Sequence, residues 1–477
     1  MIKRMNYKIL GAVLIVLTFS ACKTPDLGKM EPNQVTPETF NGSMDSTNSA
    51  QLKWREFFTD PYLVALIDTA LNHNQELNIT LQEILISRNE VRARKGEYLP
   101  FVGIGGNAGV EKVPRYTSKG ANDATTDIEP GREMPDPLPD YMIGAYANWE
   151  VDIWKKLRNA KKAAVERYLS SIEGKNFMVT NLISEIANSY FELLALDNQL
   201  EIVQRNIQIQ SNALEIVKIQ KQAARVTELA VRKFEAEVYH TRSLQFDIQQ
   251  KIIQTENRIN FLVGRYPQPV ARSPQAFTEL VPDTIYAGLP SQLLQNRPDI
   301  RQAELELAAA KLDVKVARAN FYPTLSLSAG VGLRAFDPAY LIKTPESMLF
   351  SLAGDIMAPL INRNAIKAKY YSANSKQIQA VYNYEKTLLK AYIEVVNQMA
   401  KIENLKKSYE LKSKEVEALT ESINISNDLF RSARADYMEV LMTQRDALES
   451  KFDLVETKMH QMNAMVNIYR ALGGGWN

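Results

Sequence analysis

Residue types that commonly carry chemistry are sparse in this chain. The three histidines, His73, His240 and His460, lie far apart without ligand spacing, so no metal site is expected. No glycine-rich phosphate loop opens a helix after a strand, and no nucleophile elbow is present. The sequence therefore predicts a protein that is not an enzyme, without catalytic residues or a bound metal.

The one reactive position is Cys22, which is the only cysteine. A basic start at positions 3–8 and an apolar core at 9–17 are typical of a secretory signal that is too short to span a membrane. Segment 1–21 is therefore predicted to be a signal peptide, with no cofactor expected beyond a lipid. The sequence LTFSAC resembles the lipobox of bacterial lipoproteins, which implies N-acyl and S-diacylglycerol groups on Cys22. The alternative is a signal peptide that merely ends at a cysteine.

Charge and polarity set limits on partners. With 57 basic and 55 acidic residues, the net charge of +2 gives no electrostatic reason to expect nucleic acid as a partner. Residues 24–48 are rich in Pro, Ser, Thr and Asn, and segment 22–60 is interpreted as a lipidated N-terminal tether. Lys23 follows the cysteine in place of aspartate, which by resemblance to enterobacterial sorting rules favours the outer membrane.

Strictly alternating apolar residues predict strands. Residues 324–335 place Leu325, Leu327, Ala329, Val331, Leu333 and Ala335 on one face and Ser326, Ser328, Gly330, Gly332 and Arg334 on the other. Further strands are expected at about 101–110, 141–153 and 348–356, with a long loop at about 111–140. Each strand has about the length that crosses an outer membrane when tilted. The pattern indicates lipid on one face and water on the other.

Long stretches without glycine or proline predict unusually long helices. We expect helices at about 62–95, 158–223, 227–263, 363–430 and 436–472. One heptad stripe lies in the second of these and is interrupted only by Gln210. The stripe consists of Leu193, Leu196, Leu200, Val203, Ile207, Leu214 and Val217. A second stripe, Ile202, Ile209 and Ile216, follows a neighbouring face, so this helix is expected to pack between two neighbours in a ring.

The pattern occurs twice. A first repeat at 61–264 and a second at 290–473 are joined by a connector at 265–289, and 474–477 form a C-terminal tail. Four strands cannot close a barrel, and open edges are not tolerated in hydrocarbon, so several chains must share one barrel. The predicted fold class is mainly α with a transmembrane β part, combining a long coiled-coil α-barrel with a shared β-barrel on an internal tandem repeat.

Three motifs carry a family resemblance. LPSQLLQNRPDIRQAELELAAAKLDVKVARANFYPTLSL (289–327), WEVDIWKKLRNA (149–160) and YRALGGGW (469–476) resemble the TolC-like outer membrane efflux proteins of the OprM/NodT lipoprotein branch. The resemblance implies a homotrimer in which four strands from each chain form a twelve-stranded barrel. It also implies a large periplasmic part, with an equatorial belt made from the connector and terminal segments.

The resemblance further implies partners and a function. The expected partners are a periplasmic adaptor (membrane fusion protein), an inner-membrane pump of the resistance-nodulation-division type, and outer membrane lipid. The expected function is a passive gated conduit that exports drugs and other toxic small molecules. Two alternatives are a conduit for protein secretion by an ATP-driven transporter and a purely structural coiled-coil lipoprotein.

The resemblance also places a gate at the periplasmic helix tips. Alignment of ARADYMEVLMTQRDAL puts Glu439 on one acidic position of the family and Met442 on the other, which leaves a single acidic ring. Four charged residues at the two turns, Arg434, Asp436, Arg225 and Glu228, are candidates to latch the tips by ion pairs, or are simply solvated turn residues. Arg297, Asp299 and Glu304 are expected to cap and pair helices rather than to contact substrate.

Overall fold

The computed structural model describes residues 24–476 except 29, 41, 43, 274–276, 281–284, 362 and 433, so the predicted signal peptide and Cys22 lie outside the described residues. The chain divides into two compact units. The strand unit comprises Met1–Glu31, Leu85–Leu169 and Leu305–Val381, and the helical unit comprises Pro32–Ile84, Ser170–Glu304 and Tyr382–Asn477. No helix in the described ranges has the length and apolar character needed to cross a membrane.

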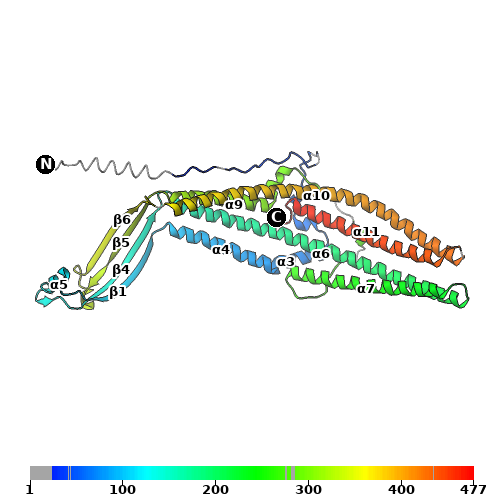
Figure 1. The fold of residues 1–477 in the computed structure, drawn as a ribbon, viewed down its shortest axis with the longest axis horizontal. Helices are drawn as coiled ribbons and strands as arrows, with labels where there is room; N and C mark the ends of the chain where they lie inside the picture. Colours follow the sequence, from blue (N-terminus) through cyan, green and yellow to red (C-terminus); the bar gives the residue numbers. More distant parts are fainter. Residues whose placement is uncertain are drawn as a thin grey trace. The chain divides into compact units, whose positions relative to one another are not determined.

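A four-stranded antiparallel sheet dominates the strand unit (Figure 1). Its strands are β1 (Phe101–Glu111), β4 (Leu138–Val151), β5 (Thr324–Ala335) and β6 (Met348–Met357), in the order β1-β4-β5-β6. The two central strands come from different sequence repeats, so the sheet joins the repeats edge to edge.

The strand register gathers the apolar positions on one face. Tyr141 lies opposite Ala335 and Trp149 opposite Leu327, so the predicted apolar residues of β4 and β5 share a face. Ile104 faces Ala145, and Phe350 faces Val331, which extends that face over β1 and β6. Because successive side chains alternate between faces, the serine, asparagine and arginine positions lie together on the other face.

The loop between β1 and β4, expected at about 111–140, has regular structure of its own. The loop contains helix α5 (Ser118–Asp123) and a hairpin of β2 (Asp127–Glu129) and β3 (Arg132–Glu133). Strand β4 also begins at Leu138 rather than at 141, because its start pairs with the end of β1 through Leu138 and Glu111. The sequence does not indicate this extension, because Pro139 lacks a backbone N–H and proline is uncommon within strands.

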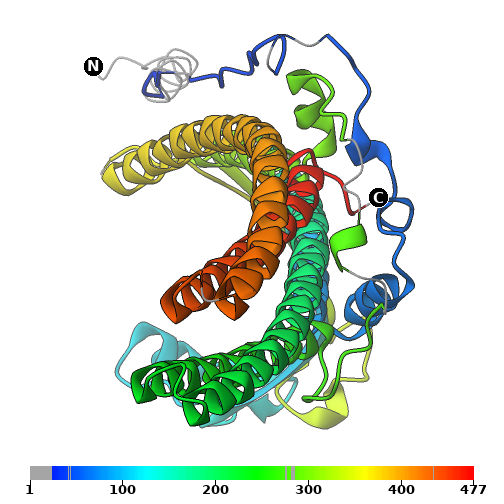
Figure 2. The same cartoon turned by 90° about the vertical axis from the view of Figure 1, so that its right-hand side faces the viewer.

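Two pairs of long helices follow the strands. They are α6 (Lys156–Gln222) with α7 (Glu228–Val263), and α10 (Asn364–Arg431) with α11 (Tyr437–Ala471). Within the helical unit the two hairpins lie side by side (Figure 2), and their side chains share apolar clusters near the turns. The shorter helices are η1 (Ser49–Gln51), α2 (Trp54–Phe57), η2 (Phe277–Glu279), η3 (Pro290–Gln292), α8 (Leu293–Asn296) and η4 (Pro338–Tyr340).

The single helix expected at 62–95 is two helices, α3 (Pro61–His73) and α4 (Gln75–Glu97). Asn74 between them has extended backbone, its Nδ2 donates to Leu262 O at 2.8 Å, and its Oδ1 accepts from Leu77 N at 2.8 Å. The second repeat has the same break at Arg297, between α8 and α9 (Pro298–Ala319). In the first repeat, the Asn74 side chain therefore caps the start of α4 and binds the break to α7.

Equivalent glycines close the two repeats. Gly264 has φ +80° at the end of α7, and Gly473 has φ +92° just after α11. A Cβ atom at Gly473 would lie 2.5 Å from Asn296 O, and one at Gly264 would collide with His73 O. Both glycines therefore need the left-handed conformation and the close approach, which fixes where the long helices end.

The described part of the N-terminal segment is mostly exposed, but a few contacts hold it against α10. In the strand unit, Gln377 Nε2 donates to Met30 O at 2.9 Å. In the helical unit, Asn33 N donates to Glu385 Oε1 at 2.8 Å, and buried Phe40 stacks on Tyr392 with ring centroids 5.4 Å apart. One buried aromatic side chain within a polar stretch is enough to anchor it, which the composition did not reveal.

Candidate functional surfaces: an exposed strand face and two hairpin turns

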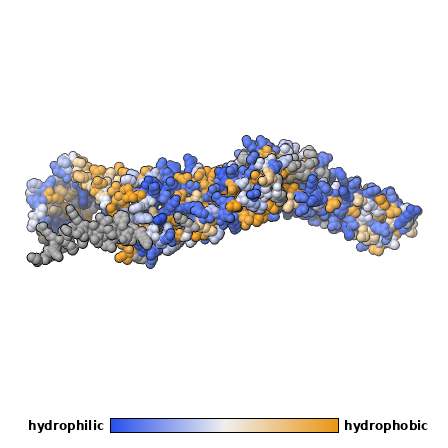
Figure 3. Space-filling model, turned by 90° about the horizontal axis from the view of Figure 1, so that it is seen from above, coloured by the Kyte–Doolittle hydropathy of each residue, from blue (hydrophilic) through white to orange (hydrophobic). Residues whose placement is uncertain are grey.

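The apolar face of the sheet is exposed. Ile104, Phe350 and Leu352 have 85%, 86% and 80% of their surface accessible, and apolar side chains are visible on the strand unit (Figure 3). A contiguous apolar face on four strands is unusual for a sheet that meets water, because such a face normally packs against another layer. The face therefore has the character of a surface that contacts lipid.

The opposite face of the sheet is polar and rich in glycine. Arg334 forms a bidentate ion pair with Asp140, with both N–O distances 2.8 Å. Tyr146 lies over neighbouring glycines, its ring within 3.3 Å of the Cβ position at Gly330. Small and polar residues on this face suit contact with water inside a barrel.

The outer edges of the sheet are open. In the described chain β1 pairs only with β4, and β6 pairs only with β5. Each edge strand therefore presents unpaired N–H and C=O groups along one side. In hydrocarbon such groups must be paired, so the sheet is incomplete as a membrane-spanning structure.

The sequence motif at 149–160 marks the end of the sheet. Trp149 Nε1 donates to Tyr98 O at 3.0 Å, and Trp154 Nε1 donates to Pro323 O at 2.8 Å. Tryptophans that keep a polar contact beside an apolar face are typical of membrane interfaces. Asp152 then accepts from the backbone N–H groups of Leu157 and Arg158, which stabilises the start of α6.

The motif around 297 is a buried ion-pair network, as expected for a structural role. The Arg297 guanidinium donates to both carboxylate oxygens of Asp299, at 2.9 and 2.6 Å, and to Glu394 at 2.8 Å. It also donates to Ala471 O at 2.9 Å. Burial on its own would lower the pKa of Arg297, but the hydrogen bonds to Asp299 and Glu394 raise it, so the group stays charged.

The motif at 469–476 is also structural. Tyr469 is buried, its hydroxyl donates to Leu52 O at 2.7 Å, and its ring stacks on Phe57 at 4.0 Å. Trp476 Nε1 donates to Asn296 O at 3.0 Å. The Tyr469 contacts fasten α11 to Leu52 and to α2, and the Trp476 contact fastens the C-terminal tail to the break before α9.

The first hairpin turn, residues 223–227, places two gate candidates. Arg225 donates its backbone N–H to Gln220 O at 2.9 Å, after Ala224 at φ +55°. Glu228 pairs with Lys221 and with Arg232, the latter at 2.8 Å, rather than with Arg225. The hydrogen bond from Lys221 holds the pKa of Glu228 below its ordinary value. The sequence could have identified Arg232 as a partner of Glu228, because the two residues are four positions apart on one helix. Lys221 lies on the other side of the turn, so the spacing gives no sign of it.

The second turn, between α10 and α11, repeats one backbone hydrogen bond of the first turn. Arg434 N donates to Leu429 O at 2.8 Å, as Arg225 does in the first repeat, and Asp436 caps α11 by accepting from Tyr437 N. In the described residues no ion pair joins Arg434 to Asp436. Glu439 is exposed on the first turn of α11 beside the exposed Met442, while Val440 and Leu441 are buried against the first hairpin.

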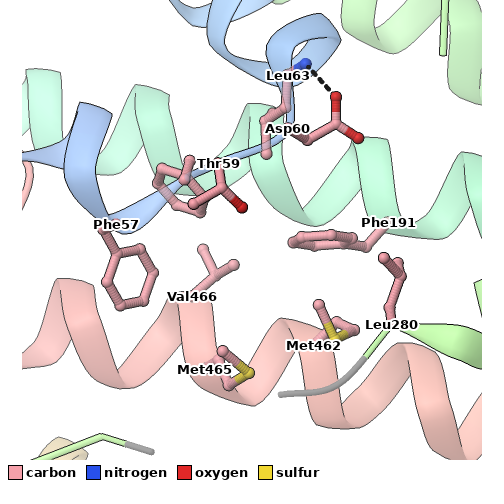
Figure 4. Close-up of a pocket in the computed structure, with 10 residues that line it drawn as sticks. Phe57, Thr59, Asp60, Leu63, Phe191, Leu280, Met462, Met465 and Val466 are labelled. Atoms are coloured by element: carbon pink, nitrogen blue, oxygen red, sulfur yellow. Dashed lines mark hydrogen bonds between the residues drawn. The ribbon is translucent and has the colours of Figure 1, made fainter. Parts of the chain in front are cut away.

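A cavity of about 110 Å³ lies within the helical unit (Figure 4). Phe57, Phe191, Met462 and Met465 are among the side chains that line it, and the nearby Asp60 accepts from the backbone N–H of Leu63. This volume is well below the roughly 300–1,000 Å³ of small-molecule sites. The cavity is thus too small to hold a drug-sized substrate.

The chain thus combines an exposed apolar strand face and open strand edges with two pairs of long helices. The family model for outer membrane efflux proteins matches residues 66–265 and 289–474, which are most of the chain. The chain belongs to the outer membrane efflux protein family. It is an efflux protein of the outer membrane, and the predicted TolC-like family, function class and location are confirmed.

Individual relatives agree with this assignment. The solvent efflux pump outer membrane protein SrpC of Pseudomonas putida is 27% identical over 481 residues, covering 99% of each chain. The pyoverdine export outer membrane protein OpmQ of Pseudomonas aeruginosa is 28% identical over 476 residues, covering 99% of this chain and 98% of OpmQ.

Solved structures have the same fold. The open state of the MtrE outer membrane channel of Neisseria gonorrhoeae superposes with a TM-score of 0.83 at 23% identity, covering 95% of this chain and 99% of that one. The Campylobacter jejuni CmeC channel gives 0.85 at 19% identity, covering 94% of each chain. The predicted combination of long helices with a β part is confirmed.

Proposed function

We propose that three copies of this chain form one channel with a shared twelve-stranded barrel. The observation that carries the proposal is the open sheet, whose apolar face is exposed and whose two edges are unpaired. Pairing β1 of one copy with β6 of the next would provide hydrogen-bond partners for the N–H and C=O groups at both edges. The polar face of the sheet would then face water inside the barrel, and the apolar face would contact lipid. The helices of the three copies would form the periplasmic tube.

In this proposal the channel is the outer membrane part of a tripartite efflux system. A periplasmic adaptor and an inner-membrane pump of the resistance-nodulation-division type would deliver substrate, and the channel would conduct it passively. The N-acyl and S-diacylglycerol groups on Cys22 would anchor the N-terminal segment in the outer membrane. Fatty-acid labelling tests this anchor, since labelling that persisted in Cys22→Ala would contradict it.

The proposed substrates are small toxic molecules. The relatives named for export of solvent and pyoverdine support this class over exported proteins. Deletion of the gene should sensitise cells to such compounds, whereas a secretion conduit would leave a protein trapped inside the cell. Sensitisation without a trapped protein would support efflux, and the reverse result would refute it.

The proposed gate lies at the two hairpin turns, with Glu439 as the residue that lines it. Glu439 is exposed beside two exposed apolar neighbours, Met438 and Met442, so in a trimer its carboxylates would form a single acidic ring. Glu439→Ala should change conductance and cation selectivity in a planar bilayer. Gln208→Ala, another exposed polar position, is the matched control. Unchanged conductance and selectivity in Glu439→Ala would remove Glu439 from the gate.

A further inference from the structure

Basic residues are concentrated in the helices and short links of the strand unit that flank the sheet. These segments are residues 85–100, 152–169, 305–323 and 358–381. Together they carry 17 lysines and arginines against six aspartates and glutamates, whereas the rest of the chain carries 40 basic and 49 acidic residues. The nearly balanced charge of the whole chain therefore conceals a strongly positive part of the strand unit, which we call the basic zone.

All four segments of the basic zone join the sheet at the same end. Phe101, at the start of β1, pairs with Asn148 near the end of β4. Thr324, at the start of β5, pairs with Met357 at the end of β6, and β4 and β5 pair with each other at this end as well. The positive charge is therefore gathered along one rim of the sheet, where the helices α4, α6, α9 and α10 meet the strands (Figure 1).

Aromatic side chains connect the basic zone to the apolar face of the sheet. Trp149 of that face donates through Nε1 to Tyr98 O at 3.0 Å, and Lys161 Nζ lies 5.9 Å from the centre of the Tyr98 ring. Trp154 stacks on Tyr322 with ring centroids 4.6 Å apart. Tryptophan and tyrosine beside lysine are typical of the interface between a bilayer and water. The basic zone therefore begins where the apolar surface ends.

Four lysines of the basic zone are exposed and have no carboxylate within ion-pair distance among the described residues. They are Lys155, Lys162, Lys367 and Lys369. Lys156, by contrast, is paired with Glu150. Lys162 and Lys367 occupy the same position in the two repeats, four residues after the start of a shared Arg-Asn-Ala sequence. These ammonium groups are available to an anion from outside the chain.

Exposed apolar side chains lie close in sequence to the same lysines. Ile153 and Trp154 directly precede Lys155, and Ile361, which is 89% exposed, lies six residues before Lys367. A large apolar side chain gains free energy by contact with acyl chains, and a neighbouring ammonium gains by contact with lipid phosphate. A charged surface that met only water would have no use for the exposed isoleucines, so the combination favours a lipid over a soluble anion.

We propose that the basic zone binds the headgroups of anionic phospholipids at the edge of the outer membrane. This inference rests on the proposed function in taking the sheet as the part of the chain that spans the membrane. The phosphates would lie against the four lysines, and the acyl chains would lie against the apolar face of the sheet. One lysine near an anionic membrane surface strengthens binding about fivefold, and salt screens the effect.

The test asks which phospholipid lies beside Trp149 and Trp154 in the full-length lipidated protein, reconstituted in phosphatidylcholine bilayers. Brominated phosphatidylglycerol or brominated phosphatidylcholine is added in equal amounts, because bromine quenches tryptophan fluorescence on contact. The native protein should prefer phosphatidylglycerol by at least about fivefold at low salt. It should lose this preference at about 1 M salt, where charges are screened within about 3 Å.

The variant with all four lysines replaced by glutamine should also lose the preference. It carries the substitutions Lys155→Gln, Lys162→Gln, Lys367→Gln and Lys369→Gln. The matched control removes the same charge from exposed lysines of α10 in the helical unit, and it should keep the preference. It carries the substitutions Lys386→Gln, Lys401→Gln, Lys406→Gln and Lys414→Gln.

Four results would overturn the proposal. Equal quenching of the native protein by the two brominated lipids would mean that the basic zone does not select an anionic headgroup. A preference retained in the zone variant, or lost equally in the control, would assign it to other residues. A zone variant that kept its preference but changed the ion selectivity of the channel would place the lysines in the water-filled bore. No quenching by either lipid would refute the membrane-spanning sheet together with the zone, whereas equal quenching by both removes only the zone.

Discussion

Replacement of Arg297 by methionine is expected to destabilise the helical unit strongly. The side chain is 4% exposed and holds two carboxylates, Asp299 and Glu394, together with the carbonyl of Ala471. Methionine fills a similar volume but leaves these three acceptors without their donor. Breaking a buried ion pair by removing one partner costs about 3–5 kcal/mol, so the free energy of unfolding should fall by about that amount.

The measurement is denaturant unfolding of the purified protein in detergent, followed by the helical circular dichroism signal. Arg258→Met is the matched control, because Arg258 is 53% exposed and contacts Glu192, which is 36% exposed, at 3.3 Å. An exposed pair of this kind contributes less than about 1 kcal/mol. If Arg297→Met lost no more stability than Arg258→Met, the buried network would not be what holds α9, α10 and α11 together.

Two further predictions concern backbone and lipid contacts. Gly473→Ala should cost more than about 1 kcal/mol, measured by thermal unfolding, because its φ is +92° and a Cβ would meet Asn296 O. Gly42→Ala, with φ +79° but open space around it, is the control, and equal losses would contradict the close approach. Leu352→Arg on the apolar face should lower barrel stability by about 2–4 kcal/mol in a folding assay with lipid vesicles. Ser351→Arg, one residue away on the opposite face, should be tolerated, and a reversed order would mean that the two faces are exchanged.

The strands and long helices were predictable because their signals are local. Alternation in Thr324–Ala335 already specifies which face each side chain takes, and the register confirms it across β4 and β5. The repeat was also visible, and it accounts for the similar breaks at Asn74 and Arg297. The break at Asn74 itself was missed because asparagine is tolerated within helices. Its reason is a contact with Leu262, distant in sequence.

The contacts at the turns and in the core depended on tertiary structure. Glu228 pairs with Lys221 because the chain reverses at Ala224 and brings the two helix ends together. The spacing of residues within one helix could not predict this pair. Gln210 was recognisable as a polar interruption of its stripe. The burial of Thr241 and Gln444 was not, since it depends on how the long helices pack against one another.

We propose that this chain becomes a channel only by sharing its sheet with two other copies. The native mass of the complex, extracted from the outer membrane in mild detergent, tests this proposal. A barrel shared by three copies predicts a mass three times that of one mature lipidated chain, stable as long as the barrel is intact. A conducting species with the mass of a single chain would contradict it.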